Sequence, residues 1–113
     1  PLARGLLAGK RVKGGGETDR ARTDNFSKRI YTRDADYAVS ARVDEVAKQH
    51  GVSNAQIALA WLYSKPIVTA PIIGVTKPGQ LEDAIGAMQL KLTDEEIRKL
   101  EEVYQPHPVL GYS

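Results

Sequence analysis

The 113-residue sequence contains no cysteine. Disulfide bonds, thiolate metal sites and a thiol nucleophile are therefore excluded, and a reducing, cytoplasmic setting is the default expectation. No apolar run approaches the roughly 20 residues that a membrane-spanning helix requires, and no start typical of a secretory signal is present, so we expect no membrane partner. The two histidines, His50 and His107, are far apart, and no metal site is predicted.

An excess of charge of one sign is also absent. Sixteen basic and fourteen acidic residues leave a formal net charge of +2, which is too balanced for a nucleic-acid-binding surface, and no nucleic-acid partner is expected. The basic excess is confined to the first third of the chain, where it could attract an anion. These cations are Lys10, Arg11, Lys13, Arg20, Arg22, Lys28, Arg29 and Arg33.

Residues 9–33 are rich in glycine and charge and lack a sustained apolar period, which predicts a long loop. Loops of this length inside compact domains are usually either functional lids or disordered segments. The chain begins with Pro1 where an initiator methionine would be expected. We therefore expect a truncated piece of a longer gene product.

From Asp36 the pattern becomes helical, because apolar residues recur with the spacing of one helix face. This stripe consists of Val39, Val43, Val46 and Ala47. The helix is predicted to end near His50, and Gly51 is placed as its terminator.

A second helix is predicted to begin at Ser53, because Ser53 and Gln56 have the spacing of a capping box. Its body, residues 57–63, is apolar on nearly every side, so we expect it to be surrounded by protein. Pro66 then stops it.

Residues 67–73 form a short, mostly β-branched run that ends at Gly74, which predicts a strand buried on both faces. Pro71 removes one hydrogen-bond donor from that strand. A single strand cannot satisfy its own backbone, so it requires partners that this sequence does not supply. A doubly buried strand between helices indicates a parallel α/β arrangement and hence a fragment of one.

Two more helices are predicted after this strand. Pro78 suits the first position of a helix over about residues 79–87. The apolar stripe of that helix is predicted to be Leu81, Ile85 and Met88. Residues 92–97 repeat the capping-box pattern, and the final helix is predicted to run to about Tyr104.

The segment over residues 72–80 runs from the predicted strand through a glycine turn into a helix amino terminus, and such a terminus attracts phosphate. Gly74 allows close approach, and Lys77 adds a full charge. Gln80, Asp83 and Ala84 are spaced to share one helix face and to touch the same ligand. An ordinary turn with a solvated lysine is the alternative, whereas a P-loop is excluded because its Lys and Ser/Thr are missing after the glycine.

Three motifs resemble the aldo-keto reductase family, in the order the family has them. The first, Pro1-Leu2-Ala3-Arg4-Gly5-Leu6-Leu7-Ala8-Gly9-Lys10, resembles the loop after the family's seventh strand. Residues 51–62 are similar to its seventh-helix region, and residues 72–84 to its eighth strand and following helix. Together the motifs cover essentially the whole chain.

The resemblance implies an α/β fold, an eight-stranded (β/α)8 TIM barrel of roughly 250 residues or more. Residues 1–113 would be the carboxy-terminal, mostly helical portion of a single NADP-dependent oxidoreductase domain, with residues 9–33 as a long loop on the cofactor side. The implied cofactor is NADP(H).

The resemblance also implies which residues bind this cofactor. Those expected to line the pyrophosphate and the strap across it are Pro1, Leu2, Ala3, Arg4 and Lys10. Those expected to hold the adenosine and its 2′-phosphate are Gly74, Thr76, Lys77, Gln80 and Asp83. Arg20 or Arg22 is a further candidate, with a solvated loop as the alternative. The family often has Asn at the position of Ala84, so the contact to adenine is in doubt in this chain.

Family members reduce aldehydes or ketones by hydride transfer, with a Tyr as general acid assisted by Lys, Asp and His. None of the five tyrosines has that sequence context. The chain is therefore expected to hold no catalytic residue and to be inactive alone, with a small-molecule carbonyl as substrate of its full-length parent. The alternative is a non-enzymatic helical interaction module derived from a barrel.

Overall fold

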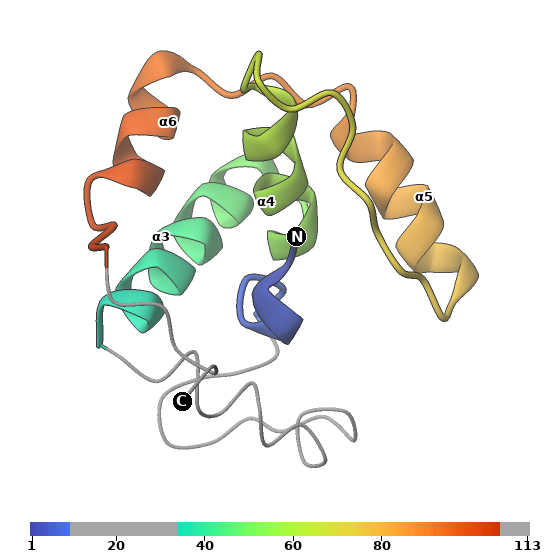
Figure 1. Cartoon of the computed structure of the whole chain (residues 1–113), viewed down its shortest axis with the longest axis horizontal. Helices are drawn as coiled ribbons and strands as arrows, with labels where there is room; N and C mark the ends of the chain where they lie inside the picture. The colour runs from blue at the N-terminus through green and yellow to red at the C-terminus, as the bar shows by residue number, and fades with distance from the viewer. Residues whose placement is uncertain (10–33, 107–113) are drawn as a thin grey trace.

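The computed structural model describes residues 1–9 and 34–106 of the chain (Figure 1). Its elements are the short 3-10 helix η1 (Ala3–Gly5) and the helices α3 (Asp34–His50), α4 (Asn54–Tyr63), α5 (Pro78–Ala87) and α6 (Asp94–Glu101). The helices lie in the spatial order α6, α3, α4, α5, because α3 contacts α6 and α4, and α4 contacts α5. The predicted loop over residues 9–33 lies, beyond Gly9, outside the described residues.

Helix α3 confirms the first helical prediction. Its buried residues include three members of the predicted stripe: Val43, Val46 and Ala47. At its end, the Val52 N–H donates to the Ala47 carbonyl at 3.1 Å, and the Gly51 N–H donates to the Lys48 carbonyl at 3.3 Å. Gly51 has φ +68°, so this pair of bonds is a Schellman motif closed by a left-handed glycine.

Helix α4 begins with the predicted capping box. The Ser53 hydroxyl accepts from the Gln56 N–H at 3.2 Å, and the Gln56 side chain accepts from the Ser53 N–H at 3.2 Å. The helix ends at Tyr63, three residues before Pro66. Its burial is less complete than predicted, since residues 57–60 are buried whereas Tyr63 remains 37% exposed.

Two apolar clusters hold the helices together. The first lies where α3, α4 and α6 meet and consists of Val43, Val46, Ala47, Ile57 and Leu100. The second joins α4 to α5 and consists of Leu59, Ala84 and Ala87. Leu2 and Ile73 pack against this second cluster from two other segments. The amino-terminal segment and the segment before α5 therefore meet on α4.

The predicted strand over residues 67–73 is wrong for this structure, in which the described residues contain no strand. No hydrogen bond joins the backbone of residues 69–75 to any other described residue. Ile67 and Ile72 are 91% and 89% exposed. A strand needs a neighbour to complete its hydrogen-bond ladder, and no segment within the described ranges lies beside this one as a strand.

Helix α5 starts at Pro78 as predicted, but the buried face differs from the prediction. Leu81, Ile85 and Met88 are exposed, and Ala84 and Ala87 are buried instead. Small side chains let two helices approach closely, and α4 packs on this alanine face. The apolar stripe therefore points away from α4.

Helix α6 also begins with its predicted capping box, because the Thr93 hydroxyl accepts from the Glu96 N–H at 3.1 Å and the Glu96 carboxylate accepts from the Thr93 N–H at 2.9 Å. It ends at Glu101 rather than near Tyr104. The Tyr104 N–H bonds to the Glu101 carbonyl three residues back, which closes a turn instead of extending the helix.

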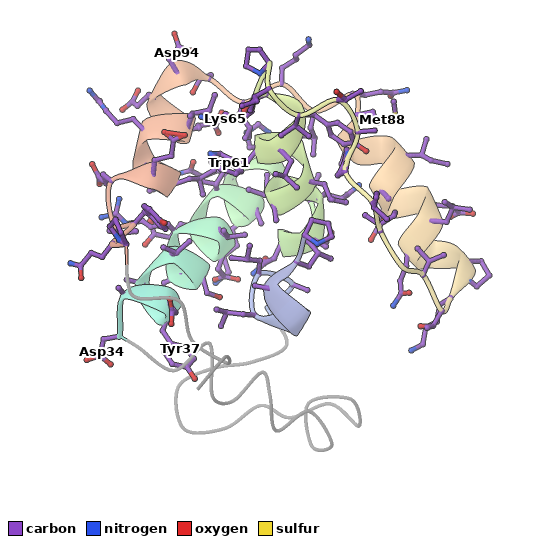
Figure 2. All side chains as sticks on the ribbon, viewed as in Figure 1. Asp34, Tyr37, Trp61, Lys65, Met88 and Asp94 are labelled. Atoms are coloured by element: carbon purple, nitrogen blue, oxygen red, sulfur yellow. The ribbon has the colours of Figure 1, made fainter. Side chains whose placement is uncertain are left out.

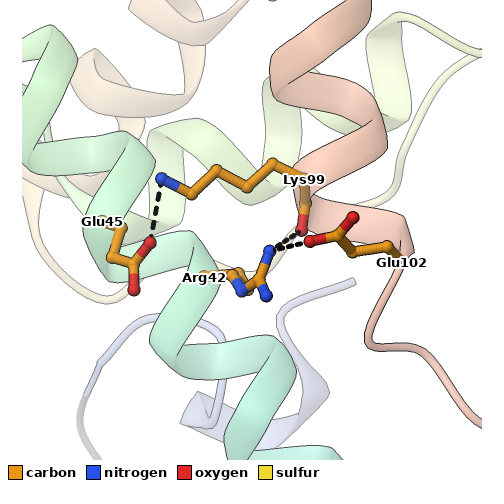
Figure 3. Close-up of polar contacts among 4 residues, drawn as sticks. All are labelled: Arg42, Glu45, Lys99 and Glu102. Atoms are coloured by element: carbon orange, nitrogen blue, oxygen red, sulfur yellow. Dashed lines mark hydrogen bonds and ion pairs between the residues drawn. The ribbon is translucent and has the colours of Figure 1, made fainter.

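Charged side chains fasten α3 to α6 (Figure 3). Arg42 forms an ion pair with Glu102 and donates to the Lys99 carbonyl at 3.2 Å, while Lys99 pairs with Glu45 at 2.9 Å. The Lys99 hydrogen bond holds the pKa of Glu45 below its ordinary value. None of the helices in the described part of the chain is long and apolar enough to cross a membrane.

Candidate cofactor-binding site

The amino terminus of α5 is built by Gln80, which folds back over the preceding turn. Its Oε1 atom accepts from the Thr76 N–H at 2.7 Å and from the Lys77 N–H at 3.3 Å, and the Thr76 hydroxyl donates to it at 3.3 Å. Lys77 is the N-cap residue with extended backbone, and Pro78 supplies the first helical position. Gln80 thus fixes the turn from within the helix.

This turn is open to solvent. Thr76 and Lys77 are exposed, and a Cβ atom added at Gly74 or Gly79 would meet no atom within 4 Å. No acidic side chain in the described ranges pairs with Lys77. A full positive charge therefore stands at the positive end of a helix dipole with free space around it, and an anion such as a phosphate fits this arrangement.

The amino-terminal segment, residues 1–9, makes a tight turn around η1. Ala3, Gly5 and Gly9 have positive φ angles of 51°, 98° and 73°. Leu6 is only 3% exposed, and its carbonyl accepts a hydrogen bond from the buried Ser40 hydroxyl at 3.0 Å. This hydrogen bond therefore anchors the amino-terminal segment to helix α3.

The described candidate residues divide into two groups that meet on α4. Leu2 packs against the second cluster, and so does Ile73, just before Gly74. Pro1 is exposed, while Leu2 and Ala3 are half-buried. Lys10, Arg20 and Arg22 lie outside the described residues, as does the side chain of Arg4.

The face that Gln80, Asp83 and Ala84 were expected to share is not available as a whole. Ala84 is 5% exposed and packs against α4, so the prediction that it touches a ligand together with the other two is wrong. Gln80 is half-buried and engaged in the turn, and Asp83 is exposed. Only Asp83 and the outer side of Gln80 remain accessible.

Sequence patterns did not predict three side-chain contacts that support these segments. Ser40 binds the Leu6 carbonyl, Gln56 donates from Nε2 to the Asp83 carbonyl at 3.2 Å, and Asn54 lies where a Cβ at Gly9 would be only 2.8 Å from its Nδ2 atom. One signal was present for Ser40. It falls on the buried face of α3 at helical spacing from Val43, where a polar residue requires a partner.

Two shallow hollows lie between α3 and α6, away from the candidate residues, and are lined mainly by charged side chains. Between α4 and α6, Trp61 donates from Nε1 to Glu101 at 3.0 Å, and Lys65 lies 5.0 Å from the Trp61 ring centre while pairing with Glu101 (Figure 2). Hydrogen bonds from Lys65 and Trp61 lower the pKa of Glu101.

Within the described ranges, no three His, Asp or Glu side chains gather as metal ligands.

The turn before α5 thus combines a glycine with an exposed cation at an open helix terminus. The sequence profile of the Aldo/keto reductase family matches residues 1–105 of this chain. The chain therefore belongs to the aldo-keto reductase family, whose members are oxidoreductases that generally use nicotinamide cofactors.

Individual relatives match across nearly the whole chain. A putative aryl-alcohol dehydrogenase of Schizosaccharomyces pombe is 40% identical over 98% of this chain and 31% of its own length. Versiconal hemiacetal acetate reductase of Aspergillus parasiticus is 38% identical over 96% of this chain and 32% of its own length. An uncharacterized oxidoreductase of Bacillus subtilis is 35% identical over 92% of this chain and 30% of its own length. The chain thus spans about a third of the length of these relatives.

Proposed function

We propose that this chain is the carboxy-terminal portion of an NADP-dependent aldo-keto reductase that reduces aldehydes or ketones, and that it supplies cofactor-binding segments rather than catalytic residues. The observation that carries the proposal is the amino terminus of α5, where exposed Lys77 lacks an acidic partner among the described residues and Gly74 and Gly79 leave open space. A phosphate bound there would be attracted both by the positive end of the helix dipole and by the full positive charge of Lys77.

Each accessible group has a definite role in this proposal. Lys77 neutralises the 2′-phosphate that distinguishes NADP from NAD. The Thr76 hydroxyl, which donates to Gln80 Oε1 in the free protein, donates to the same end of the cofactor when the cofactor is bound. Gln80 keeps the turn in shape, since its Oε1 already holds the two N–H groups of that turn. Asp83 lies one turn further along the helix, toward the adenosine.

The amino-terminal segment is proposed to line the pyrophosphate and strap it in place. Its residues are Pro1, Leu2, Ala3, Arg4 and Lys10. Leu2 of the strap and Ile73, four residues before Lys77, pack against one cluster, so both segments are attached to the α4–α5 pair. When bound, NADPH supplies the hydride that reduces the carbonyl carbon, and this chain holds the cofactor.

The fold of the full-length protein is proposed to be the (β/α)8 barrel, with residues 1–113 as its last part. Two features support this. Residues 69–75 have no backbone hydrogen bond to another described residue, and Ile67 and Ile72 are almost fully exposed, as expected of a strand whose neighbours lie elsewhere in a longer chain. The catalytic residues and the carbonyl-substrate pocket are proposed to lie in those other parts.

The proposal is tested by fluorescence titration of NADPH into the full-length protein and its Lys77→Ala variant, with NADH titrated in parallel. A hydrogen bond to a charged group contributes roughly 1.5–3 kcal/mol, so the variant is expected to raise the NADPH Kd by at least about tenfold. The NADH Kd should change little, because NADH lacks the 2′-phosphate.

Lys91→Ala is the matched control, because Lys91 is an exposed lysine that follows α5 and lies outside the turn. It removes the same charge and should leave the NADPH Kd unchanged. Equal NADPH affinity in the wild type and Lys77→Ala would remove Lys77 from the site, and no binding by the wild type would overturn the proposed function.

A further inference from the structure

One side chain, Gln56, serves two helices at once. Its Oε1 atom accepts from the Ser53 N–H and so caps its own helix, α4. Its Nε2 atom donates to the Asp83 carbonyl in the middle of α5 at 3.2 Å. The two ends of one amide therefore link the start of α4 to the helix whose terminus is the candidate phosphate site.

On α5, Gly86 leaves room for the side-chain amide of Gln56. A Cβ atom at Gly86 would lie 3.0 Å from Gln56 Nε2, which is tighter than ordinary side-chain contacts. Any larger residue at position 86 would press on the amide that reaches Asp83. The absence of a side chain at Gly86 is thus what allows α5 to lie this close to Gln56.

The fully buried apolar contact of α5 is made by small side chains. Its buried side chains are Ala84 and Ala87, which meet Leu59 of α4. Alanine faces are smooth, so they resist rotation and sliding less than interlocking large side chains do. A directional hydrogen bond from Gln56 to a backbone carbonyl resists both, because it fixes one point of α5 relative to α4.

We infer that Gln56 is a positioning residue for the cofactor helix: its bond to the Asp83 carbonyl, together with the space at Gly86, holds α5 so that the Thr76–Lys77 turn meets the cofactor phosphate. The inference rests on the proposed function. It adds to that function a residue on a different helix, one that does not touch the cofactor itself.

The test separates this role from the capping role of the same side chain. Gln56→Glu keeps an acceptor for the α4 cap, since Glu is a usual residue of a capping box, but it loses the amide donor and turns a carboxylate toward the Asp83 carbonyl. Gln56→Met removes the donor without adding charge. Ser53→Ala, the matched control, weakens the cap and leaves the link to α5 intact.

In the full-length protein, both Gln56 variants are expected to raise the NADPH Kd by about fivefold, the effect of one lost hydrogen bond of ordinary strength. Ser53→Ala should leave that Kd unchanged, although it lowers thermal stability. Gly86→Ala should raise the Kd in the wild-type background and have no further effect in Gln56→Met, because both changes break the same contact.

Hydrogen exchange of the cofactor-free protein supplies a readout that needs no ligand. The amides at the end of α5, from Asp83 to Ala87, are expected to exchange faster in both Gln56 variants and at the wild-type rate in Ser53→Ala. Unchanged exchange and Kd in Gln56→Met, or a Kd raised only by the charged Gln56→Glu, would overturn the inference while leaving Lys77 and the proposed function standing. A wild type that binds no NADPH would overturn both.

Discussion

Ser40 of α3 donates a hydrogen bond to the backbone carbonyl of Leu6 at 3.0 Å, across 34 positions of the sequence. Both residues are buried, so water does not compete for either group. Gln56 also donates to a backbone carbonyl, that of Asp83 in α5, but in an exposed position. Each of the two candidate cofactor segments is therefore tied to the α3–α4 pair through a backbone carbonyl, a link that does not use the side chains of that segment.

Ser40→Ala should destabilise the chain by about 1–3 kcal/mol, because it leaves the buried Leu6 carbonyl without a partner. Urea unfolding followed by circular dichroism measures the loss. Ser64→Ala is the control: the Ser64 hydroxyl bonds to the nearby Trp61 carbonyl at 2.6 Å in an exposed position, where water can replace it. Equal losses in the two variants would contradict the anchoring role of Ser40.

Ile57 and Ile72 are the same residue type in opposite surroundings, with 0% and 89% of their surface exposed. Ile57→Ala should cost about 2–5 kcal/mol of unfolding free energy, because it opens a cavity in the cluster that joins α3, α4 and α6. Ile72→Ala should change it by no more than about 0.5 kcal/mol in this chain. The same urea melts test both, and a large loss for Ile72→Ala would mean that the 69–75 segment is packed in solution.

Glu96 is expected to stabilise the folded chain near neutral pH and to lose this contribution in acid. Burial alone would raise the pKa of this carboxyl, but hydrogen bonds from the Thr93 N–H and from His50, whose Nε2 lies 2.5 Å from Oε2, outweigh it and hold the pKa below its ordinary value. A carboxyl with a lowered pKa in the folded state stabilises that state above its unfolded pKa of about 4.3 and loses this contribution as pH falls through the folded pKa.

The measurement is the difference in unfolding free energy between the wild type and Glu96→Gln, taken from about pH 6 down to pH 3. Gln preserves an acceptor for the cap and does not titrate. The advantage of the wild type should stay constant down to the unfolded pKa of about 4.3 and shrink as the pH falls further. Parallel curves for the two proteins would show that Glu96 carries no pH-dependent stability.

Trp61 is the only tryptophan in the sequence, so its fluorescence reports directly on the contact with Glu101. Glu101→Ala removes the partner of both Trp61 and Lys65; it should shift the emission maximum and cost at most about 1 kcal/mol, as is usual for an exposed ion pair. Glu102→Ala, the neighbouring control, breaks the pair with Arg42 instead and should leave the emission unchanged. A shift of the same size in both variants would argue against a specific Trp61–Glu101 contact.

The helix starts were predictable because local chemistry decides them. Ser53 with Gln56, and Thr93 with Glu96, satisfy the first N–H groups of their helices from within four residues, whatever surrounds them. The glycine that ends α3 works in the same local way. The open turn at Gly74 and Lys77 could also be located from the sequence, since a glycine followed by a lysine and a helix start is a short-range pattern.

The buried side of α5 could not be predicted, because it depends on which other element the helix packs against. Leu81, Ile85 and Met88 form the more apolar side, but α4 packs against the alanines, where two backbones come closest. The predicted strand failed for a related reason: β-branched residues favour extended backbone, whereas a strand exists only with a partner. The link from Gln56 to Asp83 joins residues 27 positions apart, and no pattern of neighbours points to it.

The partly exposed run over residues 67–75 is also expected to affect how the chain behaves in solution. An extended segment with open N–H and C=O groups and bare isoleucines can template the pairing of many molecules into aggregates. Pro71 lies in the middle of this run and offers no N–H, so it interrupts the row of donors that such pairing needs. Pro71 is thus expected to act as a gatekeeper against aggregation, and replacing it with a β-branched residue should lower the solubility of the isolated chain before it changes the packing of any helix.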